Sequence, residues 1–320
     1  MQPTSYHACV DIGGTKVAVS LADSQSQSNL QLYARRAEPT AKEGSASALA
    51  EQIIRMIDAA CAEHGIAPAQ VASVGVSSCG PFVLQSGMLA LAAPNICGGL
   101  GGSLGGASVG LPNNWTCAPL QAPLSQRYRA VRVENDAIGA LEAERRWGAL
   151  TGIDHCAYVT WSTGIGVGLC VDGRVLRGKN GNAGHAGHMF VSSHRDTICG
   201  CGNTGDLESV VAGNAIPRRF GQDAAAIFAA ASAGDAMATA HIDELCQVMG
   251  RALYNLIVTL DLQRISLGGS VFWHHQELLL PKLRAEVAGK LAALSDGCDI
   301  VPAGLGLRVG DLAALALVTP

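Results

Sequence analysis

Two short glycine-rich stretches contain residue types suited to holding a phosphate group. The first runs from Asp11 to Lys16 and the second from Ser162 to Gly168. Their glycines let the backbone approach phosphate oxygens without a side-chain clash, and Asp11 adds a carboxylate for hydrated Mg²⁺. Each stretch falls between two expected strands, whereas a Walker A loop is followed by a helix. An ordinary glycine hairpin is the alternative for each stretch, but two such turns in one chain favour the phosphate interpretation.

Two further motifs lie where an expected strand gives way to a helix. Asp136 could accept a proton from a hydroxyl that attacks phosphorus, and Asn135 could hold a neighbouring hydroxyl. Asn and Asp are also favoured as helix N-caps, so capping is the alternative for this pair. The strand that ends in Gly268 and Gly269 offers exposed backbone on which adenine and ribose could pack, with a simple strand-to-helix turn as the alternative.

Metal-binding residue types are concentrated in one short segment. Cys199 and Cys201 are one residue apart, with His188 about ten residues before them and Asp206 after them. Two thiols, an imidazole and a carboxylate can make a four-ligand Zn²⁺ site. The spacing is not that of a zinc finger, and two free cysteines in a glycine-rich loop are the alternative. His185 competes with Asp206 for the fourth ligand position.

The expected elements indicate an α/β protein. Hydrophobic periodicity predicts, in order, strands at 7–13, 17–22 and 30–37, a helix at 46–64, strands at 71–78 and 130–134, a helix at 136–147, strands at 156–162 and 166–176, a helix at 240–261, a strand at 264–268 and a helix at 276–294. Strands are followed by helices twice, so two related lobes around a cleft are expected. The glycine-rich stretch 96–114 is expected to be a loop that either borders the cleft or has no role.

Composition excludes several classes of protein. The 320 residues carry a formal net charge of −4, which gives no broad attraction to nucleic acid or to anionic membranes. The charge-free stretch 64–126 is interrupted by prolines, asparagines and glycines, so no membrane-spanning helix is expected. The N-terminus does not resemble a signal peptide. The 11 cysteines are mostly scattered singly, which favours reduced thiols and a cytoplasmic location.

Taken together and in this order, the motifs resemble the ROK family of sugar kinases, a branch of the actin-like ATPase superfamily. The resemblance also includes the Ala-Gly-x-x-Gly-His stretch that ends at His188 and the Cys-Gly-Cys-Gly loop that begins at Cys199. It implies an α/β, two-lobed, actin-like (ribonuclease H-like) fold with a central cleft. A small domain is expected over residues 1–130, completed by a C-terminal helix at 308–320, and a large domain over 131–307.

The resemblance also implies an activity, which is Mg²⁺- and ATP-dependent phosphorylation of a hexose or amino-hexose, at the 6-hydroxyl. It implies that Asp136 is the general base. The residues implied to bind the sugar are Asn135, His185, His188 and Glu208. Those implied to bind the nucleotide are Asp11, Gly13, Gly14, Thr15, Lys16, Thr163, Gly164, Gly268 and Gly269. Those implied to bind zinc are His188, Cys199, Cys201 and Asp206. A cytoplasmic homodimer is expected.

Two residues depart from the family pattern. His185 stands where the family usually has a Glu that binds sugar hydroxyls, and Asp206 stands where it usually has a third Cys. An imidazole can accept one hydrogen bond, so the sugar preference is expected to differ. A sugar-binding pseudokinase or regulator is the alternative function. Family repressors carry a helix-turn-helix before the phosphate turn, and ten residues before Asp11 are too few for one.

Overall fold

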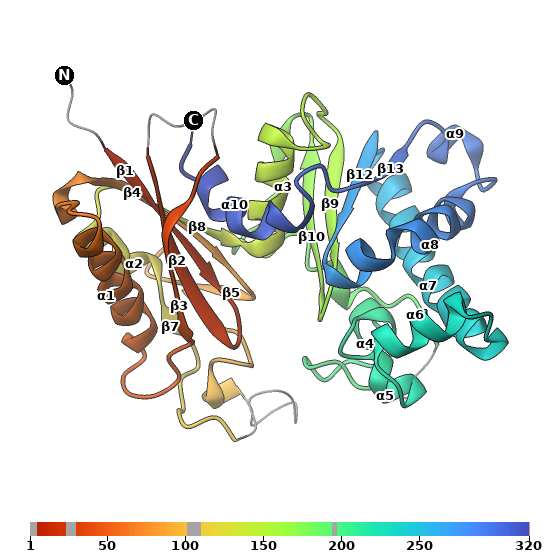
Figure 1. Ribbon diagram of the computed structural model, residues 1–320, viewed down its shortest axis with the longest axis horizontal. Coiled ribbons are helices and arrows are strands. Elements are labelled where there is room, and N and C mark those ends of the chain that lie inside the picture. Colours follow the sequence, from red (N-terminus) through yellow and green to blue (C-terminus); the bar gives the residue numbers. More distant parts are fainter. Residues whose placement is uncertain (1–4, 24–29, 101–109, 194–196, 320) are drawn as a thin grey trace. The chain divides into compact units, whose positions relative to one another are not determined.

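The chain folds into two compact units, each of which is built on its own mixed sheet (Figure 1). The computed structural model describes residues 5–23, 30–100, 110–193 and 197–319, so residues 101–109 of the expected glycine-rich loop lie outside the described residues. Unit 1 comprises residues 1–143, 177–183 and 310–320. Unit 2 comprises residues 144–176 and 184–309.

The sheet of unit 1 has the strand order β3-β2-β1-β4-β8. Its strands are β1 (Tyr6–Ile12), β2 (Lys16–Asp23), β3 (Tyr33–Pro39), β4 (Val71–Ser78) and β8 (Val131–Asn135). β1, β2 and β3 form an antiparallel meander, and β4 and β8 then join β1 in parallel. The parallel strands β1, β4 and β8 therefore all end at the same edge of the sheet.

Helices cover both faces of this sheet. Val10, Val76 and Val133 are paired across β1, β4 and β8 and pack in one apolar core with residues of α1. On the opposite face α10 lies directly against the sheet, because a Cβ on Gly75 would come within 2.1 Å of the backbone oxygen of Ala314. The remaining elements of unit 1 are α1 (Ala48–Glu63), η1 (Pro68–Gln70), β5 (Phe82–Gln85), β6 (Met88–Leu91), η2 (Gly98–Leu100), β7 (Ala118–Pro119), α2 (Gln121–Arg127), α3 (Asp136–Trp147, which continues into unit 2) and most of α10 (Val309–Ala316).

The sheet of unit 2 repeats the pattern of unit 1, with the strand order β11-β10-β9-β12-β13. Its strands are β9 (Cys156–Trp161), β10 (Ile165–Val171), β11 (Arg174–Val175), β12 (Arg264–Gly268) and β13 (Asp299–Pro302). Again three strands form an antiparallel meander and two join in parallel. The β9–β10 turn of unit 2 thus corresponds to the β1–β2 turn of unit 1, and these turns hold the two glycine-rich stretches.

The long helices α7 and α8 pack together in the core of unit 2. The helices of this unit are η3 (Ala186–His188), α4 (Leu207–Val211), α5 (Ile216–Phe220), α6 (Ala224–Ser232), α7 (Ala236–Leu260), α8 (Ser270–Val287), α9 (Ala292–Ser295) and η4 (Gly306–Arg308). α8 begins six residues before the expected 276. It bends at His275 (φ −128°, ψ 19°), which interrupts the periodicity that marks a helix in the sequence.

The division of the chain differs from the expected boundary at residue 130. β8 pairs with β4, so β8 and the following residues up to 143 belong to unit 1. Residues 177–183 leave unit 2 and belong to unit 1, which no local sequence pattern indicated. Among the described residues, no helix combines the length and the apolar character that a membrane span requires.

Candidate functional site

The first glycine turn joins β1 to β2 and presents its tip to solvent. The turn is closed by the amide of Gly13, which donates to the carbonyl of Lys16 at 2.9 Å. Thr15 and Lys16 are exposed. Thr40 stabilises the turn with two hydrogen bonds. Its hydroxyl donates to the Gly13 carbonyl at 2.7 Å, and its backbone amide donates to the Thr15 carbonyl at 3.0 Å.

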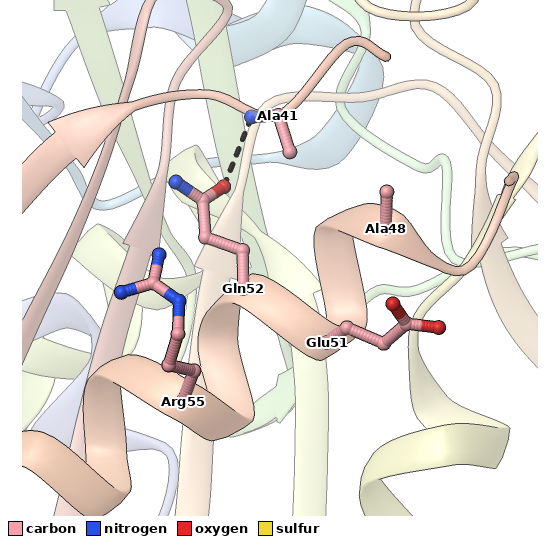
Figure 2. A pocket seen from close by; sticks show the side chains of 5 residues that line it. All are labelled: Ala41, Ala48, Glu51, Gln52 and Arg55. Atoms are coloured by element: carbon pink, nitrogen blue, oxygen red, sulfur yellow. Dashed lines mark hydrogen bonds between the residues drawn. The ribbon is translucent and has the colours of Figure 1, made fainter. Parts of the chain in front are cut away.

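Thr40 is in turn held by helix α1. The buried amide of Gln52 accepts from the amide of Ala41 at 2.9 Å and donates to the carbonyl of Pro39 at 2.8 Å. Gln52 lines a cavity of about 360 Å³ together with Glu51 and Arg55. Figure 2 shows these side chains and the hydrogen bond between Gln52 and the amide of Ala41. The polar groups of Gln52 are engaged within the protein, so we assign this side chain a supporting role behind the turn.

The two glycines of the turn have different surroundings. A Cβ on Gly14 would lie 2.0 Å from Nδ2 of Asn95, so any side chain at position 14 requires this amide to move. A Cβ on Gly13 would meet only the Lys16 carbonyl at 3.4 Å, an ordinary contact. The fold thus explains the glycine at 14, while position 13 is free to be substituted without a clash.

Asp11 lies one residue before the end of the strand that leads into this turn. Burial raises the pKa of its carboxyl to about 6, and the nearby negative charge of Asp311 adds to the rise, while Lys16 and Arg35 oppose it. A carboxylate that is costly to ionise in a buried position gains from a bound cation. This is the electrostatic setting in which a divalent metal ion would be stabilised.

Asn135 and Asp136 stand at the same sheet edge as the first turn. Ile12 of β1 pairs with Ser78 of β4, and Ser78 pairs with Asn135 of β8. Two interstrand steps of about 4.8 Å place the end of β8 roughly 10 Å from the end of β1. Asn135 is buried, whereas Asp136 is exposed and could receive a substrate.

Both side chains also accept a hydrogen bond from the first turn of α3. Oδ1 of Asp136 accepts from the amide of Ala137 at 2.8 Å, and Oδ1 of Asn135 accepts from the same amide at 3.0 Å. The capping alternative is therefore present in the structure. The hydrogen bond from Ala137 engages Oδ1 of Asp136, one of the two acceptor oxygens of this carboxylate.

In unit 2 the second glycine turn is bound to α4. Oε2 of Glu208 accepts from the amide of Ile165 at 3.0 Å, and the amide of Gly213 donates to the carbonyl of Ser162 at 2.8 Å. A Cβ on Gly164 would lie 2.7 Å from the same Glu208 oxygen. Gly164 is thus required for Glu208 to reach the turn, which the sequence did not indicate.

The glycine pair at the end of β12 packs tightly on β9. A Cβ on Gly268 would lie 2.4 Å from the hydroxyl of Tyr158, and one on Gly269 would lie 2.4 Å from the carbonyl of Trp161. Gly269 also has φ +88°, a backbone conformation that residues other than glycine rarely adopt. Packing and the turn into α8 account for both glycines without a ligand.

The metal-binding residue types are gathered by glycines and short bridges in unit 2. Gly184 and Gly187 let the segment with η3 lie on β10, since added Cβ atoms would be 2.0 Å from the Val167 carbonyl and 2.5 Å from the Ile165 carbonyl. A β-bridge between Phe190 and Asp206 brings the ends of the intervening loop together. These contacts place His188, Cys199, Cys201 and Asp206 with their ligand atoms within 4.8 Å of one another.

The separations of these atoms fit a tetrahedral ion. Nδ1 of His188 lies 3.3 Å from Oδ2 of Asp206, 3.5 Å from Sγ of Cys201 and 3.7 Å from Sγ of Cys199. Sγ of Cys201 lies 3.6 Å from Oδ2 of Asp206. Zn–N and Zn–O bonds of about 2.0–2.1 Å and Zn–S bonds of about 2.3 Å put tetrahedral ligand atoms roughly 3.3–3.8 Å apart. These four separations match a tetrahedral zinc site, and Sγ of Cys199 lies within 4.8 Å of the other donor atoms.

His185 lies next to His188 but is not one of the four residues whose ligand atoms are grouped. Its ring stacks on that of His188 with centroids 6.1 Å apart. Burial, and then the neighbouring His188, lower the pKa of His185, whereas a hydrogen bond with Asp206 raises the pKa of His188. No described residue hydrogen-bonds to the buried Nε2 of His185. A neutral imidazole with an unpartnered nitrogen is suited to binding one ligand hydroxyl.

The structure thus groups the predicted residues by unit. Asp11, Asn135 and Asp136 belong to unit 1 with the first turn, and the zinc donors, Glu208 and the second turn belong to unit 2. Sequence reasoning missed the supporting residues Thr40, Gln52 and Asn95, because each acts through a contact distant in sequence. Thr40 directly follows the observed strand β3, which ends at Pro39, two residues beyond the expected end.

The chain is similar to known proteins along nearly its whole length. Residues 7–320 match the ROK family. The chain is 32% identical over 273 residues to the N-acetylmannosamine kinase of Salmonella typhimurium, which covers 82% of each protein. The crystal structure of the ROK hexokinase from Thermus thermophilus is similar, with 29% identity, 98% and 97% coverage and a TM-score of 0.73.

The crystal structure of a third relative contains bound ligands. The ROK family glucokinase from Streptomyces griseus, in complex with glucose and AMPPNP, is 26% identical, with 97% of each chain covered and a TM-score of 0.66. The similarity spans nearly the whole chain and both five-stranded sheets. This chain therefore belongs to the ROK family and has the actin-like ATPase fold.

Proposed function

We propose that this protein transfers the γ-phosphoryl group of ATP to the 6-hydroxyl of a hexose or amino-hexose, with Asp136 as the general base. Its class, an ATP-dependent sugar kinase, is supported by its kinship with kinases along most of its length. One observation carries the assignment of the base. Asp136 and the Gly13 turn come directly after parallel strands at one sheet edge, two strand spacings apart, and this supports a hydroxyl on Asp136 that attacks a phosphate on the turn.

In the proposed reaction Asp136 takes the proton of the attacking hydroxyl. The backbone amides of Gly13 and Gly14, with Thr15 and Lys16, hold the phosphates and offset charge on the transferred group. Mg²⁺, when bound, neutralises phosphate charge, and Asp11 is the carboxylate that would hold it. We further assign Thr163, Gly164, Gly268 and Gly269 to the nucleotide.

We assign sugar binding to Asn135, His185, His188 and Glu208. The unpartnered Nε2 of His185 supports one hydrogen bond to the sugar, where a carboxylate would offer two acceptor oxygens. Glu208 has Oε2 engaged with the Ile165 amide, and its Oε1, which lies 3.5 Å from Sγ of Cys199, is the oxygen that we assign to a sugar hydroxyl. The sugar preferred by this chain is therefore expected to differ from that of relatives with Glu at this position.

We also propose that His188, Cys199, Cys201 and Asp206 bind one structural Zn²⁺. The tetrahedral separations of their donor atoms support this proposal. The ion would fix the loop that leads into α4, the helix that carries Glu208, and so orient the sugar site. A cytoplasmic homodimer is a further proposal, supported by the family resemblance and, for the location, by the 11 free cysteines.

The test is a coupled ATP assay with a panel that includes glucose and N-acetylmannosamine, followed by ³¹P NMR of the product to locate the phosphate. Asp136→Asn keeps the shape of the side chain but cannot take the proton, so kcat should fall by about 10²-fold or more while calorimetry still detects sugar binding. Asp58→Asn, an equal charge change at an exposed position, is the control. Near-native turnover of Asp136→Asn would exclude Asp136 as the base. A wild-type protein that binds sugar without phosphorylating it would support the pseudokinase alternative.

A further inference from the structure

Two buried carboxylates and two guanidinium groups meet beside the strand end that carries Asn135. Arg177 donates from Nε to Oε1 of Glu134 at 2.5 Å and from Nη2 to Oε1 of Glu142 at 3.1 Å. Arg132 reaches the same two oxygens at 3.3 Å and 2.9 Å. The side chains of Glu134 and Glu142 are only 6% and 11% exposed. The network therefore joins the end of β8 to the second turn of α3.

The two arginines of this network come from different parts of the chain. Arg132 lies two residues before Glu134 on the same strand, and so on the same face of the sheet. Arg177 is 43 residues away in sequence from Glu134 and engages both carboxylates through one planar group. A buried carboxylate that loses a partner either moves or takes up a proton. Without Arg177, Glu134 would keep its contacts with Nε and Nη2 of Arg132, both at 3.3 Å, and would lose the shorter one at 2.5 Å.

Arg177 begins a short segment, residues 177–183, that we call the strap. The strap is closed by the amide of Ala183, which donates to the carbonyl of Arg177 at 3.0 Å. Its other anchor is Asn182, whose side chain accepts from the amide of Phe82 at 2.8 Å and donates to its carbonyl at 2.7 Å. The strap is thus fixed to unit 1 at both ends, although the chain before and after it belongs to unit 2.

The strap leads directly into a segment that carries proposed sugar ligands. Gly184 starts the segment of unit 2 that contains His185 and His188. Two residues after Asn182, the backbone already packs on β10, as the close approach of Gly184 to the Val167 carbonyl shows. A single chain segment therefore passes from the β8–α3 junction of unit 1 to the histidines of unit 2.

We propose that Arg177 is a positioning residue for phosphoryl transfer, which acts by holding Glu134 and Glu142 and so fixing Asn135 and Asp136 between them. This inference rests on the proposed function, because it needs Asp136 to be the base. Misplacement of a base by about 1 Å can cost on the order of 10²-fold in rate. The loss of Arg177 is therefore expected to act on kcat and to leave the nucleotide turn unaffected.

The experiment compares Arg177→Ala and Arg177→Lys with Lys179→Ala, which removes an exposed cation from the same strap. With the best sugar of the panel, Arg177→Ala should lower kcat at least roughly tenfold with the KM for ATP little changed. Arg177→Lys keeps the charge but not the planar fork, so it should recover part of the rate. Lys179→Ala should resemble the wild type. In an Asp136→Asn background Arg177→Ala should cost little more, because the group that it positions is already gone.

The outcomes separate this inference from the proposed function. A wild-type protein that phosphorylates no sugar overturns both. An active wild type whose Arg177→Ala variant keeps kcat within twofold, or loses as much rate in the Asp136→Asn background as in the wild type, overturns the inference alone. If Arg177→Ala does not fold, Glu142→Gln removes the helix-side charge without changing shape, and the same cycle with Asp136→Asn decides in the same way.

Discussion

At the scale of single residues, Asp206 combines two contacts that a cysteine could not. Its Oδ1 accepts from the amide of Ser209 at 2.8 Å and caps α4, while its Oδ2 faces His188 and Cys201. The side chain is fully buried. The sequence predicted a carboxylate at this ligand position. It did not predict the cap, because nothing in the composition of 207–211 marked a helix there.

These two contacts can be separated by substitution. Asp206→Asn keeps the capping oxygen but presents an amide to the metal, so purified protein should hold well under one equivalent of zinc. Asp206→Cys supplies a thiolate and should retain zinc, while loss of the cap lowers the free energy of unfolding by about 0.5–2 kcal/mol. Elemental analysis and denaturant unfolding measure the two effects.

The matched control is Asp223→Asn at the N-cap of α6, where Asp223 accepts from the amide of Ala226 at 2.7 Å. This variant should leave the zinc content unchanged. Full zinc occupancy in Asp206→Asn would show that Asp206 is not a ligand, and His185 would then be the next candidate.

At the scale of elements, the sequence predicted most of the strands and the longest helices. β4, α3 and β12 have the predicted bounds, and the strand predicted at 166–176 is divided into β10 and β11 by a turn at Asp172 and Gly173, both of which have positive φ. The start of α8 was missed because the bend at His275 shifts its apolar face. The small sheet β5-β6-β7 was missed because its strands are only two to four residues long. The equivalence of the two glycine turns became visible only with the strand order.

The link from α1 to the first glycine turn carries a prediction of its own. Gln52→Ala should lower the free energy of unfolding by about 1–3 kcal/mol, because the amide of Ala41 and the carbonyl of Pro39 lose their partner. It should also raise the KM for ATP, since Thr40, which supports the turn, is held by this contact. Thermal unfolding and steady-state kinetics measure the two effects.

Glu51→Ala is the control for this helix, because Glu51 is the exposed neighbour of Gln52 and lines the same cavity (Figure 2). It should change neither quantity appreciably. Reduced stability of Gln52→Ala with an unaltered KM for ATP would mean that the support from α1 ends at Thr40 and does not reach the phosphate turn.

At the scale of the whole molecule, the chain builds one strand pattern twice. Each unit has its own apolar core, and all four proposed zinc ligands belong to unit 2. The ROK family and the actin-like fold, both predicted from the order of motifs, are confirmed. The resemblance implied that a C-terminal helix completes the small domain, and residues 310–320 do belong to unit 1, where Arg132 donates to the carbonyl of Leu317. The sequence could not predict that residues 177–183 join unit 1, because contacts such as that of Arg177 with Glu134 span long distances along the chain. The roles of the individual site residues stay predictions.

Because the proposed zinc ligands lie in one unit, removal of the metal should have a local effect. Hydrogen exchange of zinc-loaded protein and of chelator-treated protein should differ most over η3 and α4. The reason is that the loop between these two helices is no longer held by the zinc ion. Peptides from α1 and β4 of unit 1 should exchange at the same rate in both samples. Asp206→Asn, analysed without chelator, should reproduce the pattern, and added zinc but not magnesium should reverse it in the wild type alone. Equal loss of protection in α1 would instead mean that the metal stabilises the chain as a single cooperative unit.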